Sequence, residues 1–151
     1  MGTNPRIRTT HSISDAVAFA MATHVRDHYR LKFSEDETPR GCFVVLSPAG
    51  EVLVQTSMGE WQPRHNRTAH KKARTALYLQ TNTGPLDPKM ASHGRDIETT
   101  LRGGVALYDD PECTEFIGVG AFSGVPDSQK DVELVAESAY EQGIYMRGSR
   151  G

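Results

Sequence analysis

Two strand-turn-strand patterns, one in each half of the sequence, predict an antiparallel sheet. The strand-like segments are residues 42–46, 51–56, 105–108 and 116–121. In the first half, the β-branched and aromatic run CFVVL and the alternating run EVLVQT flank the turn sequence SPAG, which is typical of a β-hairpin. In the second half, Asp109-Asp110-Pro111 separates the two strands. Two hairpins joined edge to edge give a sheet of about four or five strands.

Three segments with helical spacing of apolar residues surround the hairpins. They are expected at about residues 12–28, 68–79 and 128–142. Ser12 and Ser14 can each cap the first helix, and Gly143 is well placed to end the last one. A loop over residues 59–67 is expected to lead into the second helix. The predicted fold class is α/β (α+β), a sandwich in which helices cover the antiparallel sheet.

Length and composition indicate one domain. The chain has 151 residues, of which 37% are hydrophobic and 24% are charged, enough for one core of ordinary size. We expect a flexible N-terminus over residues 1–11, a single domain over residues 12–146 and a flexible tail over residues 147–151.

The same composition disfavours several classes of protein. A formal net charge of -2 lacks the basic excess of a general nucleic-acid binder. No apolar run approaches the roughly 20 residues of a membrane span, and no apolar segment follows Arg6 and Arg8 as it would in a secretory signal. Cys42 and Cys113 form neither a CxxC pair nor a disulfide framework. We therefore expect a cytoplasmic protein without nucleic-acid or membrane partners.

A local group of cationic side chains stands out in this slightly acidic chain. It consists of Arg64, His65, Arg67 and His70. Because backbone N–H groups point outward at a helix N-terminus, such a group there can bind a carboxylate or a phosphate. Trp61 lies beside it in the sequence, and an aromatic ring next to arginines suits a flat anionic ligand. A solvated loop followed by the polar face of a helix would give the same pattern.

His24 and His28 lie four residues apart on the first expected helix, a spacing that places two imidazoles on one face. The residue after His24 is Val25 rather than the glutamate of the zinc-protease pattern HExxH. The simpler interpretation is that both histidines border the apolar stripe of the helix. The chain contains neither a GxSxG nucleophile motif nor a GxGxxG dinucleotide fingerprint, and it leaves any metal ligand unknown.

The segment AHKKARTA (residues 69–76), the turn at residues 47–51 and the glycine motifs between residues 103 and 124 together resemble the GlcG/HbpS-like family, the haem-degrading domain. Residues 69–76 (AHKKARTA) are similar to its AxxKAxTA helix, and residues 47–51 to its first hairpin turn. The second half is similar to its GGVPI strand, its GAIGVSG strand and the aspartate ahead of its last helix. The matching residues there are Gly103-Gly104-Val105, Ile117-Gly118-Val119-Gly120, Ser123-Gly124 and Asp131. The resemblance extends over about residues 14–143 and agrees with the order of elements derived above.

This resemblance implies a profilin-like sandwich, a homo-oligomer and a ligand role that in some members concerns haem or a corrinoid. Three departures are visible, one of which is a loop over residues 32–40 that is longer than the family's usual link to the first strand. Ala106 replaces the proline after GGV, and Ser57-Met58-Gly59-Glu60 replaces an RMDG motif, so that its arginine and aspartate are missing.

The expected site lies between residues 59–70 and one end of the second hairpin. Gly103 and Gly104 precede one strand, and Ser123 and Gly124 follow its partner, so both pairs fall at the same end of that hairpin. Glycines at these points permit a close approach of the backbone to a small-molecule ligand. They would equally fit tight turns and close packing of a helix on the sheet.

Three functions remain open. The first is binding of haem or a related tetrapyrrole, with degradation or sensing, in which a histidine or tyrosine ligates the iron and Arg64 or Arg67 pairs with the propionates. The second is a haem-free small-molecule enzyme in which His65 or His70 is the catalytic general acid or base. The third is a non-catalytic oligomeric accessory module.

Overall fold

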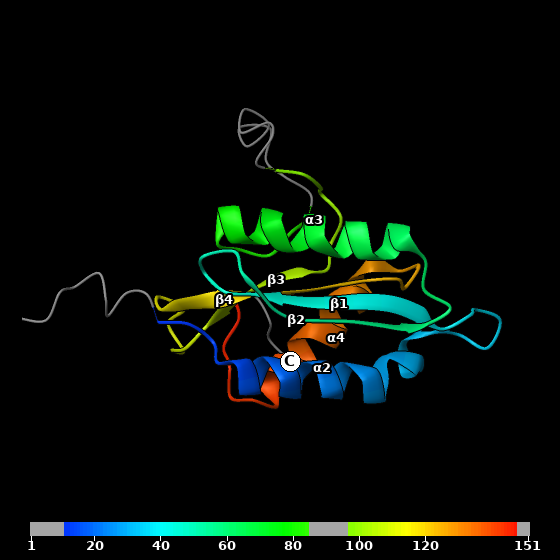
Figure 1. Cartoon of the computed structure of the whole chain (residues 1–151), viewed down its shortest axis with the longest axis horizontal. Helices are drawn as coiled ribbons and strands as arrows, with labels where there is room; N and C mark the ends of the chain where they lie inside the picture. Colours follow the sequence, from blue (N-terminus) through cyan, green and yellow to red (C-terminus); the bar gives the residue numbers. More distant parts are fainter. Residues whose placement is uncertain (1–10, 85–96, 148–151) are drawn as a thin grey trace, which may run out of the picture.

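An antiparallel sheet with the strand order β2-β1-β4-β3 lies at the centre of the computed structural model, which describes residues 11–84 and 97–147 (Figure 1). The strands are β1 (Arg40–Leu46), β2 (Val52–Gly59), β3 (Gly104–Tyr108) and β4 (Phe116–Ser123). Each half of the chain supplies one hairpin, and β1 pairs with β4 to join the two. The predicted edge-to-edge arrangement of two hairpins is confirmed.

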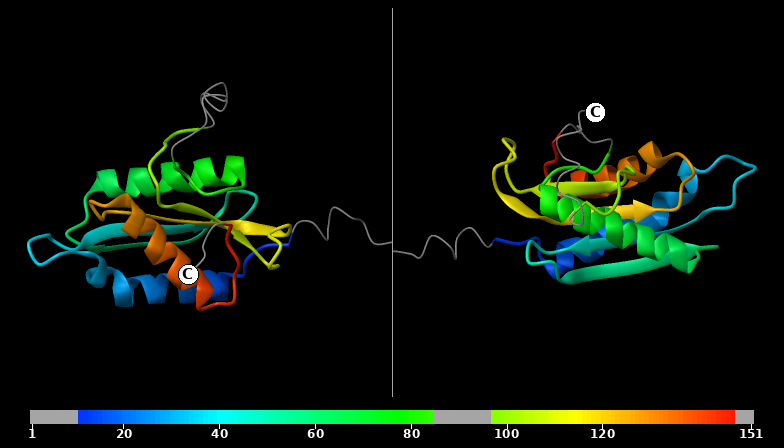
Figure 2. Two further views of the ribbon diagram at one scale, coloured as in Figure 1. Left: turned by 180° about the vertical axis from the view of Figure 1, so that it is seen from behind. Right: turned by 90° about the horizontal axis from the view of Figure 1, so that it is seen from above.

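Helices cover both faces of the sheet. One face carries α3 (Pro63–Leu79), and the other carries α2 (Asp15–His28) and α4 (Ser128–Tyr140), as the views in Figures 1 and 2 show. A short 3-10 helix, η1 (Tyr29–Lys32), continues α2. The predicted α+β sandwich, with helices on an antiparallel sheet, is therefore confirmed.

Each face of the sheet has its own apolar cluster. Between the sheet and α2 and α4 the cluster contains large side chains, among them Phe43, Met21 and Phe122. Against α3 it is built from small ones, which are Cys42, Val44, Ala69, Ala73, Ala76, Val119 and Ala121, with Leu46 beside them. A row of alanines on α3 lets this helix lie close to the sheet, because small side chains leave little space to fill.

Capping side chains fix the ends of α2 and α4. Ser14, rather than Ser12, caps α2, since its Oγ accepts a hydrogen bond from the N–H of Val17 at 3.1 Å. At α4, Asp127 accepts from the N–H of Gln129 at 3.0 Å. Helix α4 begins at the predicted residue 128, and α2 begins three residues after its predicted start.

The start of α3 was not predicted correctly. The helix begins at Pro63, so Arg64, His65 and Arg67 lie in its first turns and not in a loop over residues 59–67. Proline is well suited to the first helical position, where its missing N–H is not needed. Gln62 completes the start, because its side chain and that of His65 form a reciprocal capping box.

Predictions about the chain ends concern residues that are mostly outside the described part of the structure. Of the adjoining residues, His11 Nε2 lies 3.0 Å from Asp109 Oδ2. The guanidinium of Arg147 donates to the carbonyl of Cys113 at 2.9 Å and lies over the ring of Tyr108. Within residues 11–84 and 97–147, no helix is both long and apolar enough to cross a membrane.

Candidate functional site

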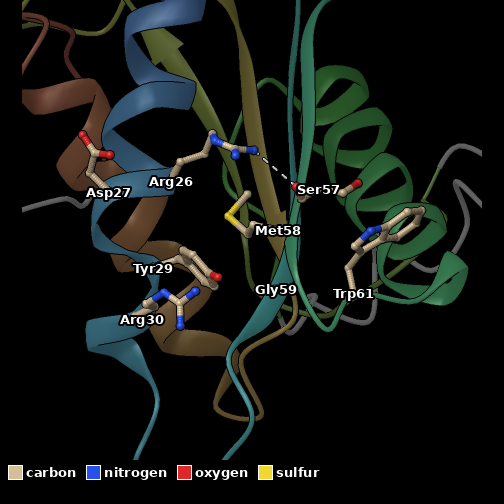
Figure 3. Close-up of a pocket in the computed structure, with 8 residues that line it drawn as sticks. All are labelled: Arg26, Asp27, Tyr29, Arg30, Ser57, Met58, Gly59 and Trp61. Carbon is tan, nitrogen blue, oxygen red and sulfur yellow. Dashed lines mark hydrogen bonds between the residues drawn. The ribbon is translucent and has the colours of Figure 1, made fainter.

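A pocket of about 400 Å³ lies between the last residues of β2 and the C-terminal half of α2 (Figure 3). Charged, aromatic, hydroxyl and thioether side chains line it together. The lining residues are Arg26, Asp27, Tyr29, Arg30, Ser57, Met58, Gly59 and Trp61. Its size is within the range of small-molecule sites, about 300–1,000 Å³.

Two guanidinium groups stand at this pocket, Arg26 on α2 and Arg30 four residues later on η1. Arg26 Nη1 donates to Thr56 Oγ1 at 2.7 Å and to the carbonyl of Ser57 at 3.3 Å, which ties the helix to β2. Arg30 lies over the ring of Tyr29, with 5.4 Å between its Cζ and the ring centroid. Both arginines are exposed, so their remaining N–H donors are available to an anion, and paired guanidiniums suit carboxylates.

The pocket surface between the arginines and β2 is mostly polar, and the side chains beneath it are firmly packed. Tyr29 and Met58 are 4% and 5% exposed, and both point into the space between α2 and β2 in Figure 3. Gly59 has a φ of +63°, and a Cβ there would lie 2.3 Å from the carbonyl oxygen of Pro39. Only glycine fits at this position. Trp61 is 44% exposed at the side of the pocket.

His65, a predicted catalytic residue, is part of the cap at the start of α3. Its Nδ1 accepts the backbone N–H of Gln62 at 2.9 Å, so the neutral ring carries its proton on Nε2. The side chain is buried, and this burial lowers the pKa of His65, with the charges of Arg64 and Arg40 lowering it further. The ring is therefore a neutral cap at neutral pH, and it does not line the pocket.

The other predicted residues of this segment point in different directions. His70 Nε2 lies 2.6 Å from Gln55 Oε1, and burial, followed by the charge of Arg74, lowers the pKa of His70. Arg64 Nε donates to the side chain of Gln62 at 3.1 Å, and Arg67 is exposed. Of the predicted site residues, only Trp61 lines the α2–β2 pocket.

Lys72 and Asp131 form an ion pair in the interior, at the end of the sheet where the predicted glycines lie. Lys72 Nζ donates to Asp131 Oδ2 at 2.8 Å, and each side chain is 2% exposed. The same ammonium donates to the carbonyl of Phe122 at 3.0 Å, and Asp131 Oδ1 accepts the N–H of Val125 at 3.1 Å. Burial raises the pKa of Asp131 to about 6, although the charge of Lys72 opposes this shift.

The predicted ligand-binding glycines pack around this ion pair and its neighbours. A Cβ on Gly103 would lie 2.7 Å from Lys72 Nζ, and one on Gly104 would lie 2.4 Å from the Lys72 carbonyl oxygen. A Cβ on Gly124 would lie 2.5 Å from the carbonyl oxygen of Arg40. Contact with a ligand at these positions, and at the buried Ser123 beside them, stays a prediction.

Comparison with known proteins identifies the family. Residues 13–140 match the family model described as haem degrading protein HbpS-like. The chain belongs to this HbpS-like family. No curated protein sequence matches the chain.

Solved structures with the HbpS-like fold resemble this chain over most of their length. One is a crystal structure of HbpS, with a TM-score of 0.71 and 15% identity over 93% of this chain and 97% of that one. Another is a PduOC:heme complex, with a TM-score of 0.64 and 19% identity over 84% and 94% of the two chains. Klebsiella pneumoniae protein ORFY gives a TM-score of 0.65 and 20% identity over 85% and 90%. At these identities the likeness concerns the fold.

The fold explains why separate motifs of this HbpS-like chain belong together. The lysine of the AxxKAxTA motif (Lys72), the glycine before β3 (Gly103) and the aspartate ahead of the last helix (Asp131) meet at the buried ion pair. Sequence analysis noted the motifs but not this pairing. The available signal was a lysine flanked by the apolar positions Ala69, Ala73 and Ala76 on the buried face of a helix.

Arg26, Tyr29 and Arg30 were also missed. Their signal was two arginines four residues apart, with a tyrosine between them, at the end of the first predicted helix.

His24 and His28 stack on the outer part of α2. Their ring centroids are 4.0 Å apart, and His28 Nδ1 donates to the carbonyl of His24 at 2.7 Å, because a carbonyl oxygen can only accept. Burial and the neighbouring His28 lower the pKa of His24. Among the described residues, no three histidine, cysteine, aspartate or glutamate side chains are grouped so that they could hold a metal ion.

A larger hollow of about 890 Å³ lies at the opposite end of the sheet, near the two hairpin turns. Acidic and apolar side chains line it together. They are His11, Pro48, Leu77, Gln80, Asp109, Thr114, Glu115 and Phe116. None of the predicted site residues is among them.

Proposed function

We propose that this chain binds haem or a related tetrapyrrole, and that the carboxylate edge of the ring enters the α2–β2 pocket. The observation that carries the proposal is the pair of guanidinium groups of Arg26 and Arg30 in the same pocket as the indole of Trp61. Arginine binds carboxylates through charge-assisted, frequently bidentate hydrogen bonds. Membership of a haem-degrading family and a fold similar to that of a PduOC:heme complex support a tetrapyrrole as the ligand.

The donor set of the pocket fits such a ligand. Tyr29 and Met58 line it, and a phenol and a thioether are both known types of haem-iron ligand, but both side chains are buried and would have to turn outward to reach an iron. Bound haem would supply a redox-active iron. The chain would neutralise the two carboxylates with arginines and cover part of the ring with Trp61. At about 400 Å³, the pocket holds one edge of a macrocycle and leaves the rest against the surface.

The sequence-based prediction names different arginines for the carboxylates. Arg64 and Arg67 lie on the first turns of α3, where both side chains are exposed. The two placements need different arginines, so single substitutions separate them.

Titration with hemin tests the proposal and its site together. Purified protein is mixed with increasing hemin, and the Soret band is followed to obtain a dissociation constant. Arg26→Ala and Arg30→Ala are each expected to weaken binding about tenfold or more, which corresponds to roughly 1.4 kcal/mol. Arg67→Ala is the matched control, because it removes an exposed arginine outside the pocket, and it should bind as the parent does.

Two outcomes would contradict this reasoning in different ways. If the Soret band of hemin does not change on adding parent protein, tetrapyrrole binding is wrong. If Arg67→Ala or Arg64→Ala loses binding while Arg26→Ala and Arg30→Ala keep it, the ligand lies at the start of α3 and not in the α2–β2 pocket.

The enzyme hypothesis built on His65 and His70 receives no added support from the geometry. His65 is held as a cap, and both pKa values are lowered, which favours neutral rings. Catalysis by either residue stays a prediction, as does a role as an accessory module.

A further inference from the structure

The larger hollow of about 890 Å³ (the hairpin-end hollow) lies at the end of the sheet away from the α2–β2 pocket. Three parts of the chain meet around it: the turn between β1 and β2, the turn between β3 and β4, and the C-terminal end of α3. They lie together at one end of the molecule in Figure 1. Its volume is within the range of small-molecule sites, about 300–1,000 Å³.

One side of the hairpin-end hollow is apolar. Leu77 of α3 and Phe116 at the start of β4 line it, and both pack against the small-residue cluster between α3 and the sheet. Phe116 also stands edge-on to the buried Tyr108, with 5.8 Å between the ring centroids. This packing holds the Phe116 ring in place at the border of the hollow. An aromatic ring there can contact an apolar body and, through its face, a cation.

Negative charge collects at the base of the β3–β4 turn. Asp109 and Glu115 both line the hollow, and the N–H of Asp109 donates to the carbonyl of Glu115 at 2.9 Å. The Asp109 carboxylate lies 3.0 Å from His11 Nε2. The side chain of Glu115 is exposed, and its carboxylate has no bonded partner among residues 11–84 and 97–147. At least one carboxylate of the hollow is therefore free to bind a cation.

The C-terminal end of α3 adds to this negative potential. Gln80, the C-cap of the helix, lines the hollow together with Leu77. A helix C-terminus carries about half a negative charge, which favours a cation nearby. The last turn of α3 has no basic residue, and no lysine or arginine of the described residues lines the hollow. The guanidinium of Arg147 approaches Tyr108 Oη at 3.3 Å but is engaged by the carbonyl of Cys113.

We propose that the hairpin-end hollow binds a small organic cation, a protonated amine on an aromatic or aliphatic body. The body lies against Leu77 and Phe116, and the ammonium group donates to the carboxylate of Glu115. An anion is disfavoured, because two carboxylates and a helix C-terminus repel it and no lining side chain offsets them. The inference is independent of the proposed function, since the two guanidinium groups of the α2–β2 pocket select the opposite charge.

Titration with three matched compounds tests this charge preference. 2-Phenylethylamine, 2-phenylethanol and 3-phenylpropionate carry a positive, a neutral and a negative group on the same aromatic body. Amide chemical shifts of the 15N-labelled chain are followed at about 50 mM salt, where exposed charges are only partly screened. The amine should bind with a Kd of about 1 mM or tighter, as expected for so small a ligand, and should shift the signals of Thr114, Glu115 and Phe116. The alcohol should bind at least about fivefold more weakly, and the carboxylate should not shift these signals.

Two substitutions on the same turn separate a site from general attraction to an acidic surface. Glu115→Gln keeps the shape of the side chain and removes its charge, so it should weaken binding of the amine at least about fivefold. Glu112→Gln is the matched control, because Glu112 is an exposed acid of the same turn that does not line the hollow. It should bind the amine as the parent does. Both positions are exposed, so both variants should fold as the parent does.

The proposal is overturned if the amine shifts no signal around the hollow at about 10 mM, or if 3-phenylpropionate binds there as tightly as the amine. Equal losses in Glu112→Gln and Glu115→Gln would also overturn it, because the attraction would then belong to the whole turn. The chain's own segment Arg6-Ile7-Arg8, which precedes His11 in the sequence, is the alternative occupant. If Arg6→Ala combined with Arg8→Ala tightens binding of the amine at least about tenfold, that segment competes for the hollow and a separate ligand is the wrong assignment.

Discussion

Replacing Asp131 by alanine leaves the ammonium of Lys72 inside the protein without a counter-ion. Both side chains are 2% exposed, so water cannot replace the lost carboxylate. The substitution also leaves the N–H of Val125 without its acceptor, while the carbonyl of Phe122 remains as the one partner of the ammonium. Breaking a buried ion pair on one side destabilises a protein by about 3–5 kcal/mol. We expect Asp131→Ala to lower the free energy of unfolding by at least about 3 kcal/mol.

Urea denaturation followed by circular dichroism measures this effect. With a slope of about 2 kcal/mol per molar urea, a loss of about 3 kcal/mol moves the midpoint down by about 1.5 M. The double variant with Lys72→Met and Asp131→Leu removes both charges and keeps apolar bulk in the same place. It should recover most of the loss, because a buried pair replaced by apolar side chains is often neutral in stability.

The Arg74–Glu98 pair provides the matched control. Its N–O distances of 2.6 and 2.8 Å are as short as those of the buried pair, but Arg74 is 48% exposed. Glu98→Ala should therefore change the free energy of unfolding by no more than about 1 kcal/mol. The reasoning is refuted if Asp131→Ala is no more destabilising than Glu98→Ala, or if the double variant is as unstable as Asp131→Ala.

Three further predictions follow from the same packing. Burial raises the pKa of Asp131 from 3.8 to about 6, so between these pH values the folded protein binds a proton more tightly than the unfolded chain. Folding is therefore favoured as the pH falls, but only in a chain that has this carboxyl group. The urea midpoint of the parent should rise relative to that of Asp131→Asn as the pH falls from about 7 to about 4.5. His65→Ala should lower the free energy of unfolding by about 1 kcal/mol. His65→Gln should keep the free energy of unfolding close to that of the parent, because a glutamine side chain can also accept the N-cap N–H at this position. If the Gln variant is as unstable as the Ala variant, His65 does not act as a cap. Gly103→Ala should lower the melting temperature far more than Gly143→Ala does. Both glycines have positive φ, but only at Gly103 would the added carbon lie 2.7 Å from Lys72 Nζ. Equal effects would mean that the Lys72 side chain moves aside at little cost in stability.

Local turn and cap chemistry made the layout of this fold predictable. The SPAG turn and Asp109-Asp110-Pro111 each follow an apolar run of strand length, and the structure has a hairpin at both places. Ser14, one of the two predicted caps, begins α2, and α4 ends at Tyr140, shortly before the predicted stop at Gly143. The start of α3 was missed because its capping box uses Gln62 and His65, a combination outside the common serine or threonine pattern.

The candidate site was much harder to predict. From the sequence, Arg26 and Arg30 look like ordinary solvent-exposed residues. Only the packing of α2 against β2 shows that they border a pocket. Lys72 was not singled out either, although its alanine neighbours on α3 place it on the buried face of the helix. Its partner Asp131 is 59 positions away, and no local rule pairs two residues at that distance. Trp61 was predicted because its residue type is rare and its neighbours are cationic.

The pairing of β1 with β4 has a consequence for the order in which the chain folds. Each hairpin forms by closing a short turn. Cys42 and Ser123, by contrast, can pair only when the long chain segment between them forms a closed loop. Closing so long a loop is the slow, entropically opposed event, so docking of the two hairpins should limit the folding rate. Substitutions on the β1–β4 seam, such as Val44→Ala, are then expected to slow folding. Substitutions in β2, an edge strand of the sheet, should mainly increase the unfolding rate. Lys72 lies on α3 and Asp131 on α4, which cover opposite faces of the sheet, so we expect their ion pair to form only after the two hairpins have docked.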